Sequence, residues 1–178
     1  MISIPNIPET EAFQSSRNRT ADRQTARCAL AAEVLRVSGA LTLRVFGCSM
    51  LPSIWPGDII AVRRAQAFDI NPGKLVLYAR DEGFVVHRAV SCSPDELITR
   101  GDALAGNDAP VQPSRVLGEV VAIQRGRSRI VPKERLSRAQ KLFGFFFRRS
   151  NLFRRLVLRL YSLRQAVNRF HPAPEWNS

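Results

Sequence analysis

Short runs of aliphatic and β-branched residues occupy the middle of the chain, and glycine, proline, asparagine or aspartate separates them. In the first run, at 41–47, Leu41, Leu43 and Val45 alternate with other residues and would share one face of a strand. Similar runs follow at 58–64, 74–80, 83–90, 96–100 and 115–124. Short strands between turn residues are typical of a meandering sheet. We therefore predict a mainly β (α+β) fold with a largely antiparallel β-sheet or partial barrel.

The apolar residues before these runs follow a helical period instead. Ala26, Leu30, Val34 and Val37 succeed one another at steps of three or four residues, which predicts a short N-terminal helix ending near Gly39.

A second helical pattern begins at Asn151. Its apolar positions are Leu152, Leu156, Leu160, Leu163, Val167 and Phe170. Arginines lie beside and opposite this stripe, and the segment KLFGFFFRRS precedes it. The pattern predicts a C-terminal amphipathic helix with an arginine-rich polar face. The chain thus divides into a mobile leader with a short helix (1–39), a β domain (40–125), and a basic linker with a helical tail (126–178).

The net charge of +12 is concentrated in the tail. Residues 1–124 hold 13 basic and 13 acidic residues, whereas residues 125–178 hold 14 basic residues against Glu134 and Glu175. Such asymmetry points to a polyanionic partner for the tail, which we expect over 141–170. An anionic membrane surface fits best; packing on the β domain or on another subunit is the alternative. Nucleic acid fits least, because the first 40 residues are too short for a DNA-binding domain.

Cysteine usage and hydropathy bear on the compartment. Cys28, Cys48 and Cys92 are odd in number and lack C-x-x-C spacing, which favours a reducing environment over a disulfide framework. The first 27 residues are polar and arginine-bearing, without the apolar core of a signal peptide. No run approaches the roughly 18 to 20 apolar residues of a spanning helix. We expect a cytoplasmic or peripheral membrane protein.

The sequence offers few groups for chemistry in the β domain. His87 and Lys74 are the possible bases, and strand alternation places His87 on one face with Val85 and Ala89. A histidine among small apolar neighbours can be a general base or simply a hydrogen-bonded structural residue. Ser49, within GCSMLPSIWPGD, would need such a base to become a nucleophile. No cluster of metal-ligand spacing and no phosphate-binding loop is present in the sequence, so we predict no metal and no cofactor.

Taken in order, the segments GCSMLPSIWPGDIIAV, PGKLVLY, VVHRAV, TRGDALAGND and VLGEVV resemble the superfamily of signal peptidase I and LexA-like serine peptidases. The resemblance covers about residues 40–122. In detail, the sequence is similar to the endoplasmic-reticulum and archaeal signal peptidases. In these, histidine replaces the usual lysine base, and two aspartates follow six positions apart.

The resemblance implies roles for particular residues. Ser49 would be the nucleophile, His87 the base, Asp108 its orienting carboxylate and Asp102 a second, supporting carboxylate. Met50 and Leu51 would line the substrate groove. Lys74 matches a surface turn position rather than the base.

The function implied is a serine endopeptidase that cleaves a protein or peptide precursor, as signal peptidases do. A LexA-like module that cleaves itself and a peptide-binding module that has lost catalysis are the alternatives.

Overall fold

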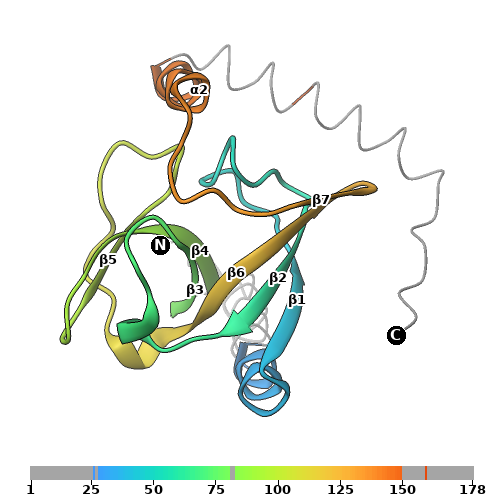
Figure 1. Ribbon diagram of the computed structural model, residues 1–178, viewed down its shortest axis with the longest axis vertical. Coiled ribbons are helices and arrows are strands. Elements are labelled where there is room, and N and C mark those ends of the chain that lie inside the picture. The colour runs from blue at the N-terminus through green and yellow to red at the C-terminus, as the bar shows by residue number, and fades with distance from the viewer. Residues whose placement is uncertain (1–25, 27, 81–82, 150–158, 160–178) are drawn as a thin grey trace, which may run out of the picture.

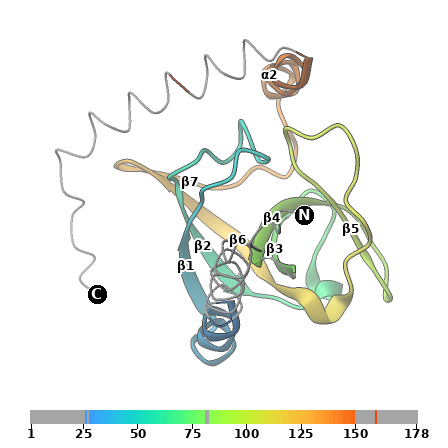
Figure 2. The ribbon, with the colours of Figure 1, turned by 180° about the vertical axis from the view of Figure 1, so that it is seen from behind.

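The structure is a computed structural model and describes residues 26, 28–80, 83–149 and 159. One seven-stranded sheet dominates it, in the order β1-β2-β6-β3-β4-β5, with β7 paired to β6 (Figures 1 and 2). The strands are β1 (Ala40–Arg44), β2 (Ile59–Arg64), β3 (Leu75–Arg80), β4 (Gly83–Cys92), β5 (Leu97–Arg100), β6 (Val116–Arg125) and β7 (Ser128–Ile130).

Every strand pair is antiparallel, which confirms the mainly β prediction. The edge strands β1 and β5 do not pair with each other, so the sheet is open. Register shifts interrupt the ladders at Ala61/Val62, Leu77/Tyr78 and Ala89/Ser91. Such irregularities increase local twist, which suits the strongly curved sheet that the ribbon shows.

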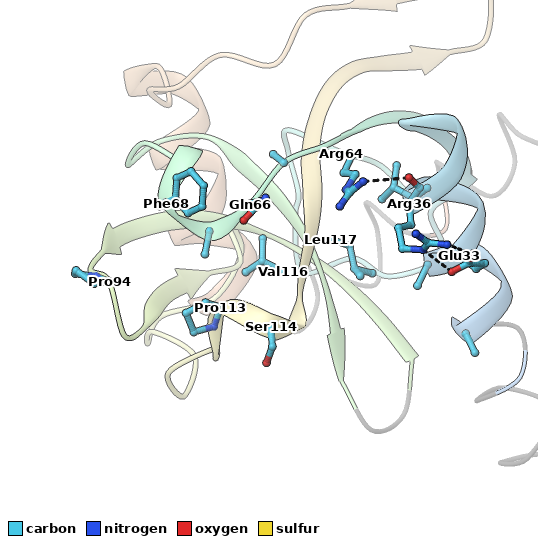
Figure 3. Close-up of a pocket in the computed structure, with 15 residues that line it drawn as sticks. Glu33, Arg36, Arg64, Gln66, Phe68, Pro94, Pro113, Ser114, Val116 and Leu117 are labelled. Atoms are coloured by element: carbon cyan, nitrogen blue, oxygen red, sulfur yellow. Dashed lines mark hydrogen bonds and ion pairs between the residues drawn. The ribbon is translucent and has the colours of Figure 1, made fainter.

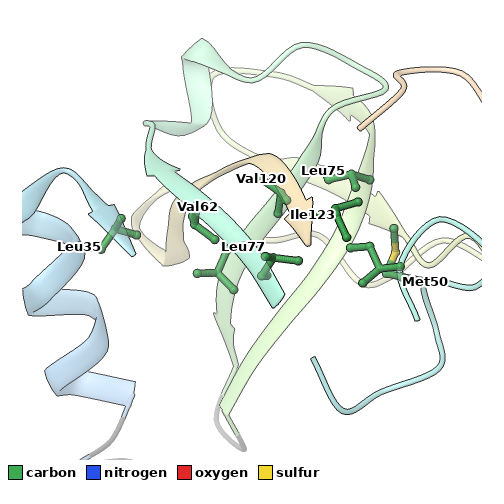
Figure 4. Packing of buried hydrophobic residues seen from close by; sticks show 9 residues of the cluster. Leu35, Met50, Val62, Leu75, Leu77, Val120 and Ile123 are labelled. Atoms are coloured by element: carbon green, nitrogen blue, oxygen red, sulfur yellow. The ribbon is translucent and has the colours of Figure 1, made fainter. Parts of the chain in front are cut away.

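The predicted alternation along the strands is present in the packing. Leu41, Leu43 and Val45 all pack against one core cluster. Its buried members include Leu35 and Met50, which Figure 4 shows at its two sides. On β4, Phe84 and Val86 pack against this cluster. The alternating residues Val85 and Ala89 belong instead to a second cluster that contains Tyr78 and Val111. His87 therefore shares a strand face with the second cluster, as strand geometry requires.

The short N-terminal helix is present and ends where it was predicted, next to Gly39. Residues 28–38 are helical, and only Leu35 is fully buried among them, at 1% exposure. Leu30, Val34 and Val37 of the predicted stripe are 67%, 40% and 73% exposed. Cys28, Ala31, Ala32 and Leu35 form the less exposed face. The apolar spacing therefore predicted the helix, but most of the large apolar side chains that define this spacing are exposed.

The C-terminal element that the structure describes is α2 (Arg138–Arg149). It precedes the predicted tail helix, whose apolar stripe from Leu152 to Phe170 lies outside the described residues. Arg159, within that stretch, is helical and exposed. α2 and the N-terminal helix lie at opposite ends of the molecule (Figures 1 and 2). Across the described part of the chain, no helix combines the length and apolar character needed to cross a bilayer.

Two short 3-10 helices, η1 (Ala67–Asp69) and η2 (Pro113–Arg115), complete the described structure.

Candidate active site

Ser49, His87 and Asp108 meet in a continuous chain of polar contacts. Ser49 Oγ lies 3.0 Å from His87 Nε2, and His87 Nδ1 lies 2.5 Å from Asp108 Oδ2. The carboxylate requires a proton on Nδ1, which leaves Nε2 to accept the serine hydroxyl proton. His87 is only 4% exposed, while Ser49 is partly exposed. The arrangement can therefore activate an accessible hydroxyl by a buried imidazole.

Three further side chains hold Asp108 in place. Thr99 on β5 donates its hydroxyl to Asp108 Oδ2 at 2.7 Å, and Tyr78 on β3 donates to the same oxygen at 3.3 Å. Arg80 approaches the other oxygen, Oδ1, at 3.4 Å. Burial works to raise the pKa of Asp108, but the hydrogen bonds from Thr99 and His87 and the charge of Arg80 outweigh it. The pKa of Asp108 therefore lies below its ordinary value, and the carboxylate is ionised at neutral pH.

Ser49 lies in a tight turn between β1 and β2, at residues 47–58, which we call the serine turn. Its backbone carbonyl accepts a hydrogen bond from the amide of Ala103 at 2.8 Å, which joins the turn to the 101–108 loop. Gly101 is packed so closely that a Cβ there would lie 2.7 Å from the Ser49 carbonyl oxygen. Glycine at position 101 thus lets the nucleophile and aspartate segments approach each other.

The far end of the serine turn is held by a buried ion pair. Asp58 is 2% exposed, accepts the Trp55 amide at 2.8 Å, and pairs with Arg125 Nη2 at 2.7 Å. Arg125 also donates to the Ser53 carbonyl at 3.0 Å and lies over the Trp55 ring, 5.8 Å from its centroid. The turn is therefore fixed at both ends, which restricts the position of Ser49 between them.

Met50 and Leu51 differ from the expectation that they line a groove. Met50 is 2% exposed within the core cluster of Figure 4, and Leu51 is fully buried against Ala103. The peptide bond between Leu51 and Pro52 is cis. Both side chains attach the serine turn to the apolar interior, because burying an apolar side chain is favourable.

Asp102 does not contact His87. It instead receives two hydrogen bonds of 2.8 Å from Arg88, the residue after the histidine, and one of 2.5 Å from Ser53. Arg88 Nη2 also donates to Ser53 Oγ at 3.2 Å. Asp102 therefore connects the serine turn to the histidine strand through Arg88, and of the two aspartates it is Asp108 that contacts the imidazole.

Lys74 is engaged away from the serine. Its ammonium group pairs with Glu119 at 3.0 Å and Glu134 at 3.3 Å. Hydrogen bonds to these two carboxylates raise the pKa of Lys74, so the side chain remains protonated and is a poor base. Its position fits the expected turn lysine.

The residues that support the site were not found from the sequence. Tyr78, Arg80 and Thr99 lie on strands. Their distances from Asp108 along the sequence do not indicate that their side chains contact its carboxylate. The dipeptide of His87 and Arg88 was visible as part of a motif, but the partners of Arg88 depend on tertiary packing.

A cavity of about 570 Å³ lies elsewhere, between the N-terminal helix and the two 3-10 helices (Figure 3). Glu33, Arg36, Arg64 and Phe68 are among its lining residues. Neither Ser49 nor His87 nor Asp108 lines it. We therefore do not assign this cavity to the serine site.

Comparison with known proteins gives one family likeness for this chain. Residues 12–98 match the family model described as Peptidase S24-like, which falls within the LexA and signal peptidase superfamily. The matched segment includes Ser49 and His87 and ends before both aspartates. A search of curated proteins found no match to the chain. The fold and the family match together support a module of the serine-peptidase or LexA-like type.

Proposed function

We propose that this protein is a serine endopeptidase that cleaves a protein or peptide precursor by acyl transfer, with Ser49 as nucleophile, His87 as general base and Asp108 as the orienting carboxylate. The observation that carries the proposal is the unbroken contact chain from Ser49 Oγ through His87 to Asp108, at 3.0 and 2.5 Å. Nucleophile, base and orienting group in this order form the arrangement that activates a serine hydroxyl.

In the first half of the reaction, Ser49 Oγ attacks the carbonyl carbon of the scissile peptide bond while His87 Nε2 takes the hydroxyl proton. The tetrahedral oxyanion would be met by backbone amides of the serine turn. As the C–N bond breaks, His87 returns the proton to the leaving amine, and an acyl-serine ester remains.

In the second half, water attacks the ester carbonyl and gives a proton to His87. Collapse of this second intermediate breaks the ester bond, and His87 protonates Ser49 Oγ to restore the enzyme. Asp108 stays ionised throughout and holds the Nδ1 proton, so that Nε2 always faces the serine.

Histidine rather than lysine serves as the base in this proposal. Lys74 is held protonated by Glu119 and Glu134, whereas His87 directly contacts the serine hydroxyl. This choice supports the likeness to the histidine-base signal peptidases, and with it a role in processing precursor peptides.

A self-cleaving regulatory module is the second candidate, because the family match also fits LexA-like proteins. In that case the scissile bond would belong to this chain. A peptide-binding module without activity would keep the fold and bind peptides, yet release no product.

The test uses the full chain and a mixture of precursor peptides, with products followed by mass spectrometry. We expect cleavage by the wild type and by Ser128→Ala, which alters an exposed serine of β7, and none by Ser49→Ala. Shortening of the wild-type chain alone, without peptide products, would favour self-cleavage. Equal cleavage by Ser49→Ala and the wild type would refute the proposed mechanism.

A further inference from the structure

The outward face of α2 combines exposed apolar and cationic side chains. Arg138, Leu142, Phe145 and Arg149 are spaced by four, three and four residues, so they lie on one face of the helix. Leu142 is 56% exposed and Phe145 is 53% exposed, and the two arginines at the ends are exposed as well. We call these four residues the α2 outer face.

The opposite side of α2 holds the helix on the domain. Phe143 contacts Trp55 of the serine turn, with ring centroids 6.1 Å apart, and it packs against the small cluster of Leu51 and Ala103. Gly144 is buried, which allows the helix backbone to approach the domain. Phe143 and Gly144 thus attach this side of the helix, while Leu142 and Phe145 each keep more than half of their surface exposed.

The segment that leads into α2 is fastened as well. Arg88 Nη1 donates to the carbonyl oxygens of Lys133 at 2.7 Å and Glu134 at 3.3 Å. Gly73 lies so close that a Cβ there would be 2.8 Å from the Glu134 carbonyl oxygen. We call residues 131–137 the strap. Since strap and helix are both attached, the outer face has a defined direction relative to the domain.

Charge identifies the kind of surface that fits the outer face. Residues 135–149 contain five basic residues and no acidic residue. A second copy of the chain would bring basic faces together and is disfavoured by repulsion. A nucleic acid duplex would use the cations, but its backbone would offer no apolar region to the exposed surface of Leu142 and Phe145. The headgroup region of an anionic bilayer satisfies both requirements.

We propose that the α2 outer face docks on anionic lipid membranes, with Leu142 and Phe145 entering the headgroup boundary and the flanking arginines contacting lipid phosphates. Twelve residues of helix lying in the plane of the interface suffice for such binding, and none of the chain has to cross the bilayer. The proposal does not depend on Ser49 being a nucleophile, because binding and cleavage are measured separately.

The test is co-sedimentation of the full chain with vesicles made of equal parts phosphatidylglycerol and phosphatidylcholine. We expect binding to these vesicles and none to pure phosphatidylcholine. In the double variant Leu142→Glu/Phe145→Glu, the affinity should fall roughly tenfold or more. The matched control is Leu30→Glu/Val37→Glu, which changes two apolar residues of comparable exposure at the other end of the molecule and should bind as the wild type does.

A second measurement keeps the proposal testable if the double variant folds poorly. In Leu142→Trp, the added fluorescence should be quenched by brominated lipid in anionic vesicles. Unchanged vesicle binding by a folded double variant, or an unquenched tryptophan, would overturn the proposal. Tighter binding of a single-stranded RNA oligonucleotide than of the vesicles, lost in the same double variant, would assign the face to nucleic acid instead.

Discussion

Thr99 donates a hydrogen bond of 2.7 Å to Asp108 Oδ2, the same oxygen that accepts the Nδ1 proton of His87. Thr99 is completely buried, so no water competes for this contact. The threonine therefore fixes the carboxylate that fixes the imidazole. Its function in the proposed reaction is to position Asp108, without contact to the substrate.

Replacing Thr99 by valine keeps the shape of the side chain but removes the donor. A hydrogen bond to a charged group contributes about 1.5–3 kcal/mol, so we expect kcat/KM for peptide cleavage to fall roughly tenfold to a hundredfold. Thr99→Ser restores the hydroxyl and should recover most of the activity. A serine variant as slow as the valine variant would mean that packing, rather than the hydrogen bond, matters at this position.

Asp108→Asn should lower the rate of peptide cleavage far more than Thr99→Val does. The amide can present its NH₂ group to Nδ1 and favour the tautomer that cannot take the serine proton, a change that lowers kcat by about 10⁴-fold in a serine protease triad. Peptide cleavage followed by mass spectrometry provides the rate. Asp95→Asn is the comparison, because Asp95 is exposed and lies in the turn between β4 and β5. If both variants lost activity equally, the assignment of Asp108 as the orienting residue would be untenable.

Stability should depend on the ionisation of Asp108. Its pKa is lowered in the folded protein, so the ionised carboxylate stabilises the fold above the ordinary value of 3.8. This contribution is lost as the pH falls through the lower, folded pKa. Urea unfolding of the wild type and Asp108→Asn, from about pH 6 down to about pH 2, should show a difference that shrinks in acid. A difference that is constant over this range would contradict the assignment.

Arg88→Met should destabilise the fold strongly. The variant leaves Asp102 charged, with its side chain only 3% exposed, and breaking a buried pair in this way costs about 3–5 kcal/mol. The control is Arg36→Met, whose partner Glu33 is exposed and can be solvated, so little change is expected. Urea unfolding gives both free energies. Equal effects in the two variants would show that the Arg88 pair is not specially important.

Gly101→Ala should separate the serine turn from the aspartate loop. The new Cβ would lie 2.7 Å from the Ser49 carbonyl oxygen and 3.0 Å from Leu104. Overpacking of this kind costs about 1–3 kcal/mol, and cleavage should fall because Ser49 moves relative to His87. Gly106→Ala is the control, since a Cβ there has open space. Full activity in Gly101→Ala would show that the close approach is not required.

The fold was predictable wherever a local period controls it. Leu41, Leu43 and Val45 alternate and share a core, and β4 divides its residues between two clusters as expected. The N-terminal helix also followed its apolar spacing, but its burial could not be predicted, because Leu35 is buried while Leu30, Val34 and Val37 remain exposed. α2 was not predicted as a separate helix, since Gly144 and neighbouring phenylalanines obscure its period.

The residues of the site also divide into those that the sequence predicts and those that only the folded structure reveals. Ser49, His87, Asp102 and Asp108 could be proposed from motifs and the resemblance, and the structure brings three of them into one contact chain. Thr99 and Tyr78 could not be proposed, because their hydroxyls reach Asp108 only after β3, β4 and β5 have paired. Contacts that depend on strand pairing leave no local pattern.

Arg88 holds the strap only through main-chain carbonyl oxygens, those of Lys133 and Glu134. Such an attachment is indifferent to which side chains these two positions carry. A substitution at either position would leave these two hydrogen bonds in place, and one at Glu134 would remove only its exposed ion pair with Lys74. Inserting or deleting one residue, in contrast, would displace α2 and rotate its outer face. In this connection, chain length is thus under tighter constraint than residue identity.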